Sequence, residues 1–472
     1  MAHSFAHLLH RVKHDPIGLI PPSTLRRALA ASPRRFRCRK LPPHRLVEAM
    51  LVQAVHGNTS IEHLKHLCPA MTAVSPQAFC KARQRLPLEL LRALAVELTA
   101  QMLNADEADG PGGRWGFGPG HRVLLLDAFG FRTADTEALA QAFGRPAGRG
   151  SRTANKPEGQ RKPALPFGHS LALVGHRSGG IPVLDVVLFT GPGHQHDLHS
   201  VEEAHGQLVD GDLLPGDTHF ATVMHFSLAR ANGVHLLARG KLKKAGEEPA
   251  LPPHAPEGLG VVVESDQRRV MRHRGGLPPW MVEATFEQLP QTAEVREVVY
   301  RLEAVGFRTR RVKLQTTLLD AEAYPAEELA KLYLLRWQVE VDFRHLKATM
   351  KAAVLKGKSQ DVVLKELWSL VLAYNAVCLA VMEAARRKKV SPGRVSFVDA
   401  VRWVRAYLDG RGEPLVGLER LKVNAVNRRW WEPRVLYACH AKHAHATKPR
   451  AAYHREREAA GLPSGPARKE AA

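Results

Sequence analysis

The chain has 472 residues, of which 44% are apolar and 6% aromatic, a composition typical of globular proteins with sizeable cores. Its 68 lysines and arginines outnumber 46 acidic residues, which gives a formal charge of +22. A protein this basic should attract polyanions, and nucleic acid is the first candidate; a basic enzyme without such a partner is the alternative.

The cysteines and apolar runs favour a cytoplasmic protein without a membrane segment. The five cysteines are scattered and odd in number, which argues against a disulfide framework. The first ten residues are too polar for a secretory signal. The longest apolar run, 367–382, contains Ser369, Tyr374 and Asn375 and is too short for a bilayer span, so it predicts a buried core helix.

Residues 1 to about 105 show apolar residues at helical spacing and no strand pattern. Ser75 can cap a helix that begins at Pro76. Two basic residues of this helix, four apart, share a face that could enter a major groove, and a solvated helix face is the alternative. The basic residues of the helix are Lys81, Arg83 and Arg85.

A glycine-rich stretch at 109–120 marks a boundary, after which short apolar runs with β-branched residues predict strands. Three strands in succession, followed by a helix at 220–231 and another strand, predict a mixed α/β sheet and argue against a purely parallel one. The strand candidates are 122–126, 170–174, 182–190 and 234–238.

From about 241 to 324 the chain shows strands and turns, and helical spacing returns at Pro325. The pattern predicts a β-rich insertion between two parts of an α/β core. The expected regions are a helical N-terminal DNA-binding domain (1–108), the first part of the core (109–240), the insertion (241–325), a helical completion of the core (326–390) and a C-terminal region with a polar tail (391–472), where dimerisation is possible.

The segment 333–347 combines one acid with three groups that bind phosphate. At helical rotation its four side chains, Tyr333, Arg336, Glu340 and Lys347, fall within about 60° of one another. Guanidinium, ammonium and phenol suit phosphate oxygens, while the glutamate could hold a metal beside a nucleic-acid backbone. An amphipathic helix with ordinary ion pairs between residues four apart is the alternative.

Two aspartates follow apolar strand candidates. Asp127 closes the run Val123-Leu-Leu-Leu, and Asp217 follows a similar run. Open α/β sheets build sites at such strand ends, and two aspartates with Glu340 would supply the oxygen ligands of a two-metal phosphodiester site. Singly, each aspartate also suits a turn or a helix cap. The ligand type favours Mg²⁺, which Mn²⁺ could replace.

Rival chemistries have weaker support. The histidines at 194–199 could bind a transition metal, although a polar loop explains them as well. The cysteine and histidines at 439–445 lack a second ligand pair at finger spacing. No phosphate-binding P-loop or nucleophile elbow is present in the sequence.

The 333–347 segment resembles the bacterial insertion-sequence transposases with a DDE site, in the cut-and-paste branch named after insertion sequence four. Its residues match that family's Y-(2)-R-(3)-E-(6)-K signature at full spacing. The flanking segments 324–330 and 365–375 also resemble the family, and the similarity covers most of the chain.

The resemblance implies an RNase H-like core in which Asp127, Asp217 and Glu340 are the catalytic acids and bind two Mg²⁺ ions. Family members often have glycine after the first acid, where this chain has Ala128. Asp135 belongs to a second family element nearby and is the alternative first acid.

The resemblance also implies DNA contacts. Tyr333, Arg336 and Lys347 would grip terminal phosphates, and Trp280 would stack on a flipped base, with a core tryptophan as the alternative. The tail at 429–440 departs from the family's usual ending.

The expected function is transposition. A homodimer would pair the terminal inverted repeats in double-stranded DNA. It would cut the DNA at these ends, with hairpin ends as intermediates, and then join the ends to target DNA. An inactive or repurposed DNA-binding repressor and an RNase H-like nuclease are the alternatives.

Overall fold

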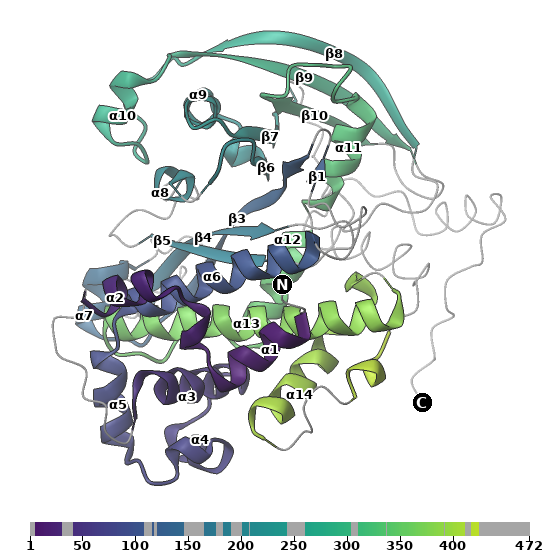
Figure 1. The fold of residues 1–472 in the computed structure, drawn as a ribbon. Helices are drawn as coiled ribbons and strands as arrows, with labels where there is room; N and C mark the ends of the chain where they lie inside the picture. The colour runs from purple at the N-terminus through teal and green to yellow at the C-terminus, as the bar shows by residue number, and fades with distance from the viewer. Residues whose placement is uncertain are drawn as a thin grey trace, which may run out of the picture.

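The computed structural model describes residues 5–30, 41–107, 116–117, 120–145, 165–175, 183–189, 201–206, 208–242, 260–303, 310–336, 338–390, 392–410 and 417–423. A twisted sheet and its covering helices lie above a layer of helices from both ends of the chain (Figure 1). The histidine cluster at 194–199, the segment 429–445 and most of the glycine-rich stretch at 109–120 lie outside the described residues.

The N-terminal region is helical, as its apolar spacing predicts. Ser75 caps α5, because its hydroxyl accepts a hydrogen bond from the Ala78 amide at 3.2 Å, and Pro76 is the first residue of that helix. Its α-helices, within the described residues, are α1 (Phe5–His14), α2 (Pro22–Ala30), α3 (Pro43–Val55), α4 (Ile61–Leu67), α5 (Pro76–Arg85) and α6 (Leu88–Glu107).

The strands form a mixed α/β sheet, which confirms the predicted class. Strands β3 (Leu124–Arg132), β4 (Phe167–Gly175) and β5 (Val183–Phe189) are antiparallel in the order β3-β4-β5. Strands β6 (Leu213–Gly216) and β7 (His235–Arg239) are parallel. A parallel bridge between Val123 and Leu213 joins the two groups, so the central order is β5-β4-β3-β6-β7.

Strand β3 is longer than the sequence pattern predicts. The expected strand ended at Asp127, whereas β3 continues to Arg132 and pairs with β4 throughout. Phe129 and Phe131 alternate into the core, and this alternation extends the strand beyond the apolar run. Asp127 therefore lies inside a strand and not at its end.

The predicted β-rich insertion extends the same sheet. Strand β10 (Arg310–Thr316) pairs with β7, and the order continues through β9 (Thr292–Glu303) to β8 (Gly260–Arg272) at the edge. A second, smaller core lies under this part and contains residues of α9 (Val223–Ala231) together with Trp280. The short helix α10 (Glu283–Gln288) closes that side (Figure 1).

The helices after the insertion are α11 (Ala326–Leu335), α12 (Gln338–Arg344), α13 (Gln360–Lys388) and α14 (Phe397–Leu408). Helix α13 packs beside α3 and α6 and shares one hydrophobic core with them (Figure 1). It is the one described helix long and apolar enough to span a membrane, but its apolar window is fully buried. This confirms the predicted core helix, and the core continues across the boundary expected near residue 108.

Candidate active site

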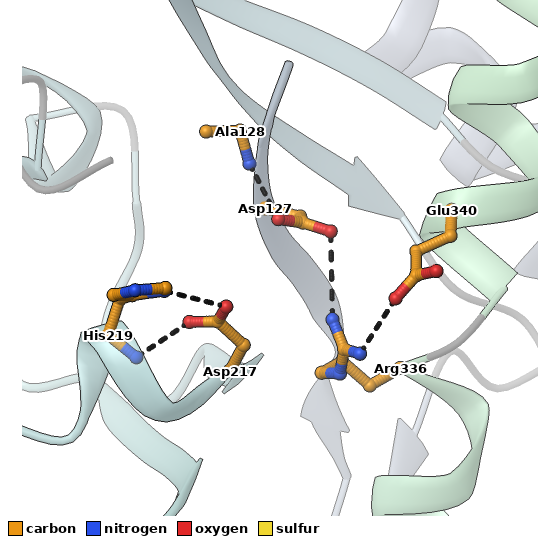
Figure 2. Close-up of polar contacts among 6 residues, drawn as sticks. All are labelled: Asp127, Ala128, Asp217, His219, Arg336 and Glu340. Atoms are coloured by element: carbon orange, nitrogen blue, oxygen red, sulfur yellow. Dashed lines mark hydrogen bonds and ion pairs between the residues drawn. The ribbon is translucent and has the colours of Figure 1, made fainter. Parts of the chain in front are cut away.

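Three carboxylates from three elements lie close together. Asp127 comes from β3, Asp217 follows β6, and Glu340 lies in the first turn of α12. The parallel bridge joins Val123 to Leu213, and each aspartate lies four residues beyond it, so the two carboxylates reach the same level of neighbouring strands. Figure 2 shows Asp127 between Asp217 and Glu340.

The Asp127 carboxylate is largely buried. Its Oδ1 atom accepts a hydrogen bond from the Ala128 amide at 2.8 Å, and its Oδ2 atom lies 3.6 Å from Arg336 Nη1. Burial raises the pKa of Asp127 to about 7; Arg336 and the Ala128 amide lower it, and Asp217 and Glu340 raise it further. Asp127 thus carries a net electrostatic cost when it is ionised.

Asp217 caps the short helical turn Thr218–Phe220. Its Oδ1 atom accepts a hydrogen bond from the His219 amide at 2.8 Å, and its Oδ2 atom lies 3.0 Å from His219 Nδ1 (Figure 2). Gly216 allows this tight turn, because a Cβ there would come within 3.0 Å of Phe220. The sequence pattern did not point to His219; its position two residues after a strand-end aspartate is the only signal for it.

Arg336 lies between two of the acids (Figure 2). Its Nη2 atom donates to Glu340 Oε1 at 3.0 Å while Nη1 faces Asp127. The ordinary ion pair between residues four apart is therefore present, and the same guanidinium also serves a second carboxylate. Although burial opposes the charge on Arg336, Tyr333, Asp127 and Glu340 together raise its pKa. Arg336 is thus the counter-ion of this site.

The donor set suits a divalent cation. Carboxylate oxygens are hard ligands of the kind that Mg²⁺ and Mn²⁺ prefer, and three acids with one arginine leave negative charge that a cation would offset. Among the described residues, no three ligands are already gathered at metal-binding distance. The Arg336 guanidinium occupies the space between Asp127 and Glu340 that a shared ion would need.

The 333–347 segment is divided, whereas one continuous helix was expected. Helix α11 ends at Leu335, α12 begins at Gln338, and residues His345–Thr349 form a π-helical turn. A π turn adds a residue to the helical period and so redirects the side chains that follow it. The four signature side chains therefore do not form a single strip.

Tyr333 and Lys347 accordingly have different surroundings. Tyr333 is only 1% exposed, and burial raises its pKa to about 12. Lys347 is partly exposed, and its Nζ atom lies 5.6 Å from the centre of the Phe129 ring. Burial lowers the pKa of Lys347, and Asp127 opposes that shift. Lys347 is therefore a partly exposed cation near Asp127, whereas Tyr333 is a buried core residue.

The other predicted residues lie away from the acids. On α5, Lys81 is exposed, Arg83 lies over the Phe79 ring at 5.7 Å, and Arg85 Nε donates to the Lys81 carbonyl. Trp280 is 8% exposed within the smaller core, so the structure favours the core alternative for it.

Asp135, the alternative first acid, forms its ion pair with an arginine other than the Arg336 that Asp127 and Glu340 share. It pairs with Arg145 at 2.7 Å, next to helix α7 (Glu137–Phe143). The position of Asp127 opposite Asp217 makes it the better candidate.

Sequence comparison finds relatives among transposases. The transposase InsG for insertion sequence element IS4 of Escherichia coli (strain K12) is 34% identical over 107 residues, which are 22% of this chain and 24% of that protein. The probable transposase for insertion sequence element IS5377 of Geobacillus stearothermophilus is 30% identical over 112 residues, or 24% and 28% of the two chains. Each match thus spans about a quarter of the relative's length.

A cryo-EM structure of the piggyBac transposase synaptic complex with hairpin DNA has a TM-score of 0.40 and 11% identity, over 98% of this chain and 86% of that one. This likeness is too distant to support any assignment. The family model of the transposase DDE domain, in contrast, matches residues 118–376, more than half of the chain. The chain therefore belongs to the family defined by the transposase DDE domain.

Proposed function

We propose that the protein is a DNA transposase that binds the terminal inverted repeats of its insertion sequence, cleaves the DNA strands there and transfers them to target DNA. The observation that carries the proposal is the proximity of Asp127 to Asp217 and Glu340 within the matched domain, with Arg336 shared between Asp127 and Glu340. The central strand order β5-β4-β3-β6-β7, with Asp127 on β3 and Asp217 directly after the adjacent β6, supports an RNase H-like core.

Asp127, Asp217 and Glu340 would hold two Mg²⁺ ions, with Mn²⁺ as a substitute. When bound, the ions would activate the attacking oxygen and neutralise charge on the phosphate. Arg336 contacts two of these carboxylates in the metal-free protein and so offsets part of the repulsion between them. Replacing any of the three acids removes hard oxygen ligands and should stop cleavage.

The remaining signature side chains would position DNA. Lys347, partly exposed near Asp127, would bind a phosphate near the reacting bond, and Arg336 would turn toward a phosphate when a cation takes its place between the carboxylates. Tyr333 is buried, so it would contact DNA only after a local rearrangement that exposes its hydroxyl group. In-line geometry and charge neutralisation suffice for this chemistry, without a covalent enzyme intermediate.

The DNA-binding part of the proposal concerns the N-terminal helices. Their α5 presents the exposed Lys81, and the chain as a whole carries a charge of +22. We assign region 1–108 to end recognition, 109–240 and 326–390 to the catalytic core, 241–325 to the insertion, and 391–472 to dimerisation. The protein would act in the cytoplasm as a homodimer that pairs two ends.

A cleavage assay on labelled DNA tests the proposal. Purified protein and Mg²⁺ are added to duplexes that carry either the element's own ends or a scrambled sequence, and products are separated on native and denaturing gels. We expect nicks at the element boundary in the first duplex alone, followed by hairpin and strand-transfer products. Sequence-independent cutting without strand transfer would favour a nuclease, and end binding without cutting would favour a repressor.

A further inference from the structure

A buried glutamate joins the N-terminal helices to the segment that follows the active-site lysine. Glu366 of α13 is 6% exposed. Its Oε1 atom accepts from Asn58 Nδ2 at 2.7 Å, and its carboxylate accepts from the backbone amides of Lys356, at 2.9 and 3.0 Å, and Gly357, at 2.8 Å. We call these four residues, Asn58, Lys356, Gly357 and Glu366, the Glu366 junction.

The junction is closed by a second contact across the same boundary. Lys356 Nζ donates to the Asn58 carbonyl oxygen at 2.7 Å, so Asn58 is held through its side chain and its backbone. Asn58 has a φ of +53° and lies in the turn between α3 and α4. The junction thus fixes the turn in the N-terminal helical region against the segment 350–357.

That segment also contacts the catalytic strand. It follows the π-helical turn that contains Lys347, and it then runs beside the end of β3. The Arg132 amide donates to the Ala353 carbonyl at 2.9 Å, and the Leu355 amide donates to the Arg132 carbonyl at 2.8 Å. Because β3 carries Asp127, the segment connects two parts of the active site to Glu366.

Two glycines make the close approach possible. A Cβ on Gly57 would lie 2.9 Å from the Lys351 side chain, and its φ of +68° also disfavours other residues. A Cβ on Gly357 would lie 2.8 Å from the Val363 backbone nitrogen. The N-terminal turn and α13 therefore both pack closely against the 350–357 segment.

The neighbouring lysine extends the connection to α5. Lys365 Nζ donates to the carbonyl oxygen of Gln84, in the last turn of α5, at 3.0 Å and pairs with Asp361 at 2.6 Å. Lys365 and Glu366 are consecutive on α13. One short stretch of α13 thus contacts both the helix proposed to meet DNA and the segment that leads to Lys347 and Asp127.

We propose that Glu366 is a positioning residue that couples end-DNA binding by the N-terminal helices to the placement of Lys347 and Asp127 for cleavage. This inference rests on the proposed function. Glu366 itself touches no reacting group; it acts through the segment 350–357. It therefore governs how fast bound DNA is cut rather than how tightly DNA is bound.

The test compares Glu366→Ala and Glu366→Gln with Glu383→Ala. Glu383 is a matched control, because it is a buried carboxylate on the same helix that pairs with Arg386 and Arg387 at the far end. Three quantities are measured: the affinity for end DNA, the single-turnover cleavage rate at saturating protein, and deuterium uptake of the peptides covering 345–357 with and without end DNA in metal-free buffer.

In Glu366→Ala we expect the cleavage rate to fall at least about tenfold, since small misplacements of reacting groups are costly, while affinity stays within about twofold. Glu366→Gln, which keeps one acceptor oxygen, should fall between this variant and wild type. End DNA should slow deuterium uptake at 345–357 in wild type and Glu383→Ala but not in Glu366→Ala.

A Glu366→Ala rate equal to that of Glu383→Ala, or DNA-dependent protection that survives in Glu366→Ala, would overturn the inference. The deuterium measurement needs binding and no cleavage, so it decides the inference even if wild type proves unable to cut. Failure of wild type to cut would count against the proposed function alone. If Glu366→Ala does not fold, Glu366→Gln supplies the same comparisons.

Discussion

Asp127 and Glu366 are both carboxylates with raised pKa values, and burial, partial at Asp127 and nearly complete at Glu366, is the main cause at each. Their partners differ. Glu366 accepts hydrogen bonds from Asn58 and from two consecutive backbone amides. Asp127 accepts one, from the Ala128 amide, and faces Arg336 at the longer distance of 3.6 Å.

The charges around the two carboxylates differ as well. Arg83 and Lys356 lower the pKa of Glu366, whereas Asp217 and Glu340 add repulsion at Asp127. A carboxylate surrounded by donors holds neighbouring segments together. A carboxylate placed near two others, with a single shared arginine, keeps an electrostatic cost that a bound cation would relieve. The same functional group thus holds segments together in one region, and in the other it leaves a site that a cation would stabilise.

The largest expected effect is on cleavage. Asp127→Asn should lower the cleavage rate at least about 1,000-fold, because losing a metal ligand removes several kcal/mol of transition-state stabilisation. Binding of end DNA should change little. The measurement is a single-turnover gel assay with Asp135→Asn as the control; loss of cutting in the control instead would make Asp135 the first acid.

The second expected effect is that Glu366→Ala and Asp127→Asn change the free energy of unfolding in opposite directions. Glu366→Ala should lower the free energy of unfolding by roughly 2 kcal/mol, because it leaves buried donors unpaired. Asp127→Asn should raise it at pH 8, by an amount on the order of 3 kcal/mol or less, because it removes a buried charge. Urea unfolding of both variants checks this. A lower free energy of unfolding in Asp127→Asn than in wild type at pH 8 would contradict the proposed difference between the two carboxylates.

The increase in the free energy of unfolding expected for Asp127→Asn should depend on pH. An Asp127 pKa of about 7 lies above the ordinary value of 3.8, so between these values the folded protein binds more protons at this site than the unfolded chain. The wild-type penalty therefore grows as pH rises through that window and is constant above it. The stability advantage of Asp127→Asn should be larger at pH 8 than at pH 5.

The third prediction concerns proton release on metal binding. A metal ligand must be deprotonated, so Mg²⁺ binding to wild type should release protons from Asp127 at pH 6, below its pKa of about 7, and almost none at pH 8.5. Calorimetry in buffers of different ionisation enthalpy measures the number of protons. Asp127→Asn should show none of this release, and equal release at both pH values would count against the assignment.

The smallest expected effect separates the exposed and buried members of the signature. Lys347→Met should weaken binding of end DNA a few-fold. It should also lower the slope of log affinity against log salt concentration by the amount expected for about one phosphate contact. Tyr333→Phe should leave the salt dependence unchanged, because Tyr333 is buried. Affinities measured across a salt series decide this; equal slopes for both variants would mean that Lys347 does not contact phosphate.

Much of the fold could be predicted from the sequence. Apolar spacing located the N-terminal helices, the mixed sheet and the buried α13, because these depend on local periodicity. The residue types and their spacing also singled out Asp127, Asp217 and Glu340 as candidates, and the structure brings these three residues near one another.

Long-range packing explains what the sequence could not reveal. The burial of Tyr333 depends on how α11 lies against the sheet, and the break between α11 and α12 does not follow from helical spacing. Glu366, like Lys365 and Glu383, is a charged residue in the mostly apolar helix α13, which was the available signal, but its partners come from distant segments. No local pattern links Asn58 to Glu366.

The most direct test of the central claim is a denaturing-gel cleavage assay that compares wild type with Glu340→Gln, on duplex DNA carrying the element's own ends, with Mg²⁺. Wild type should nick the DNA at the element boundary. Glu340→Gln should bind the same DNA without nicking it, because the amide cannot replace the carboxylate as a metal ligand. Undiminished cleavage by Glu340→Gln would contradict the assignment of Glu340 to the metal site.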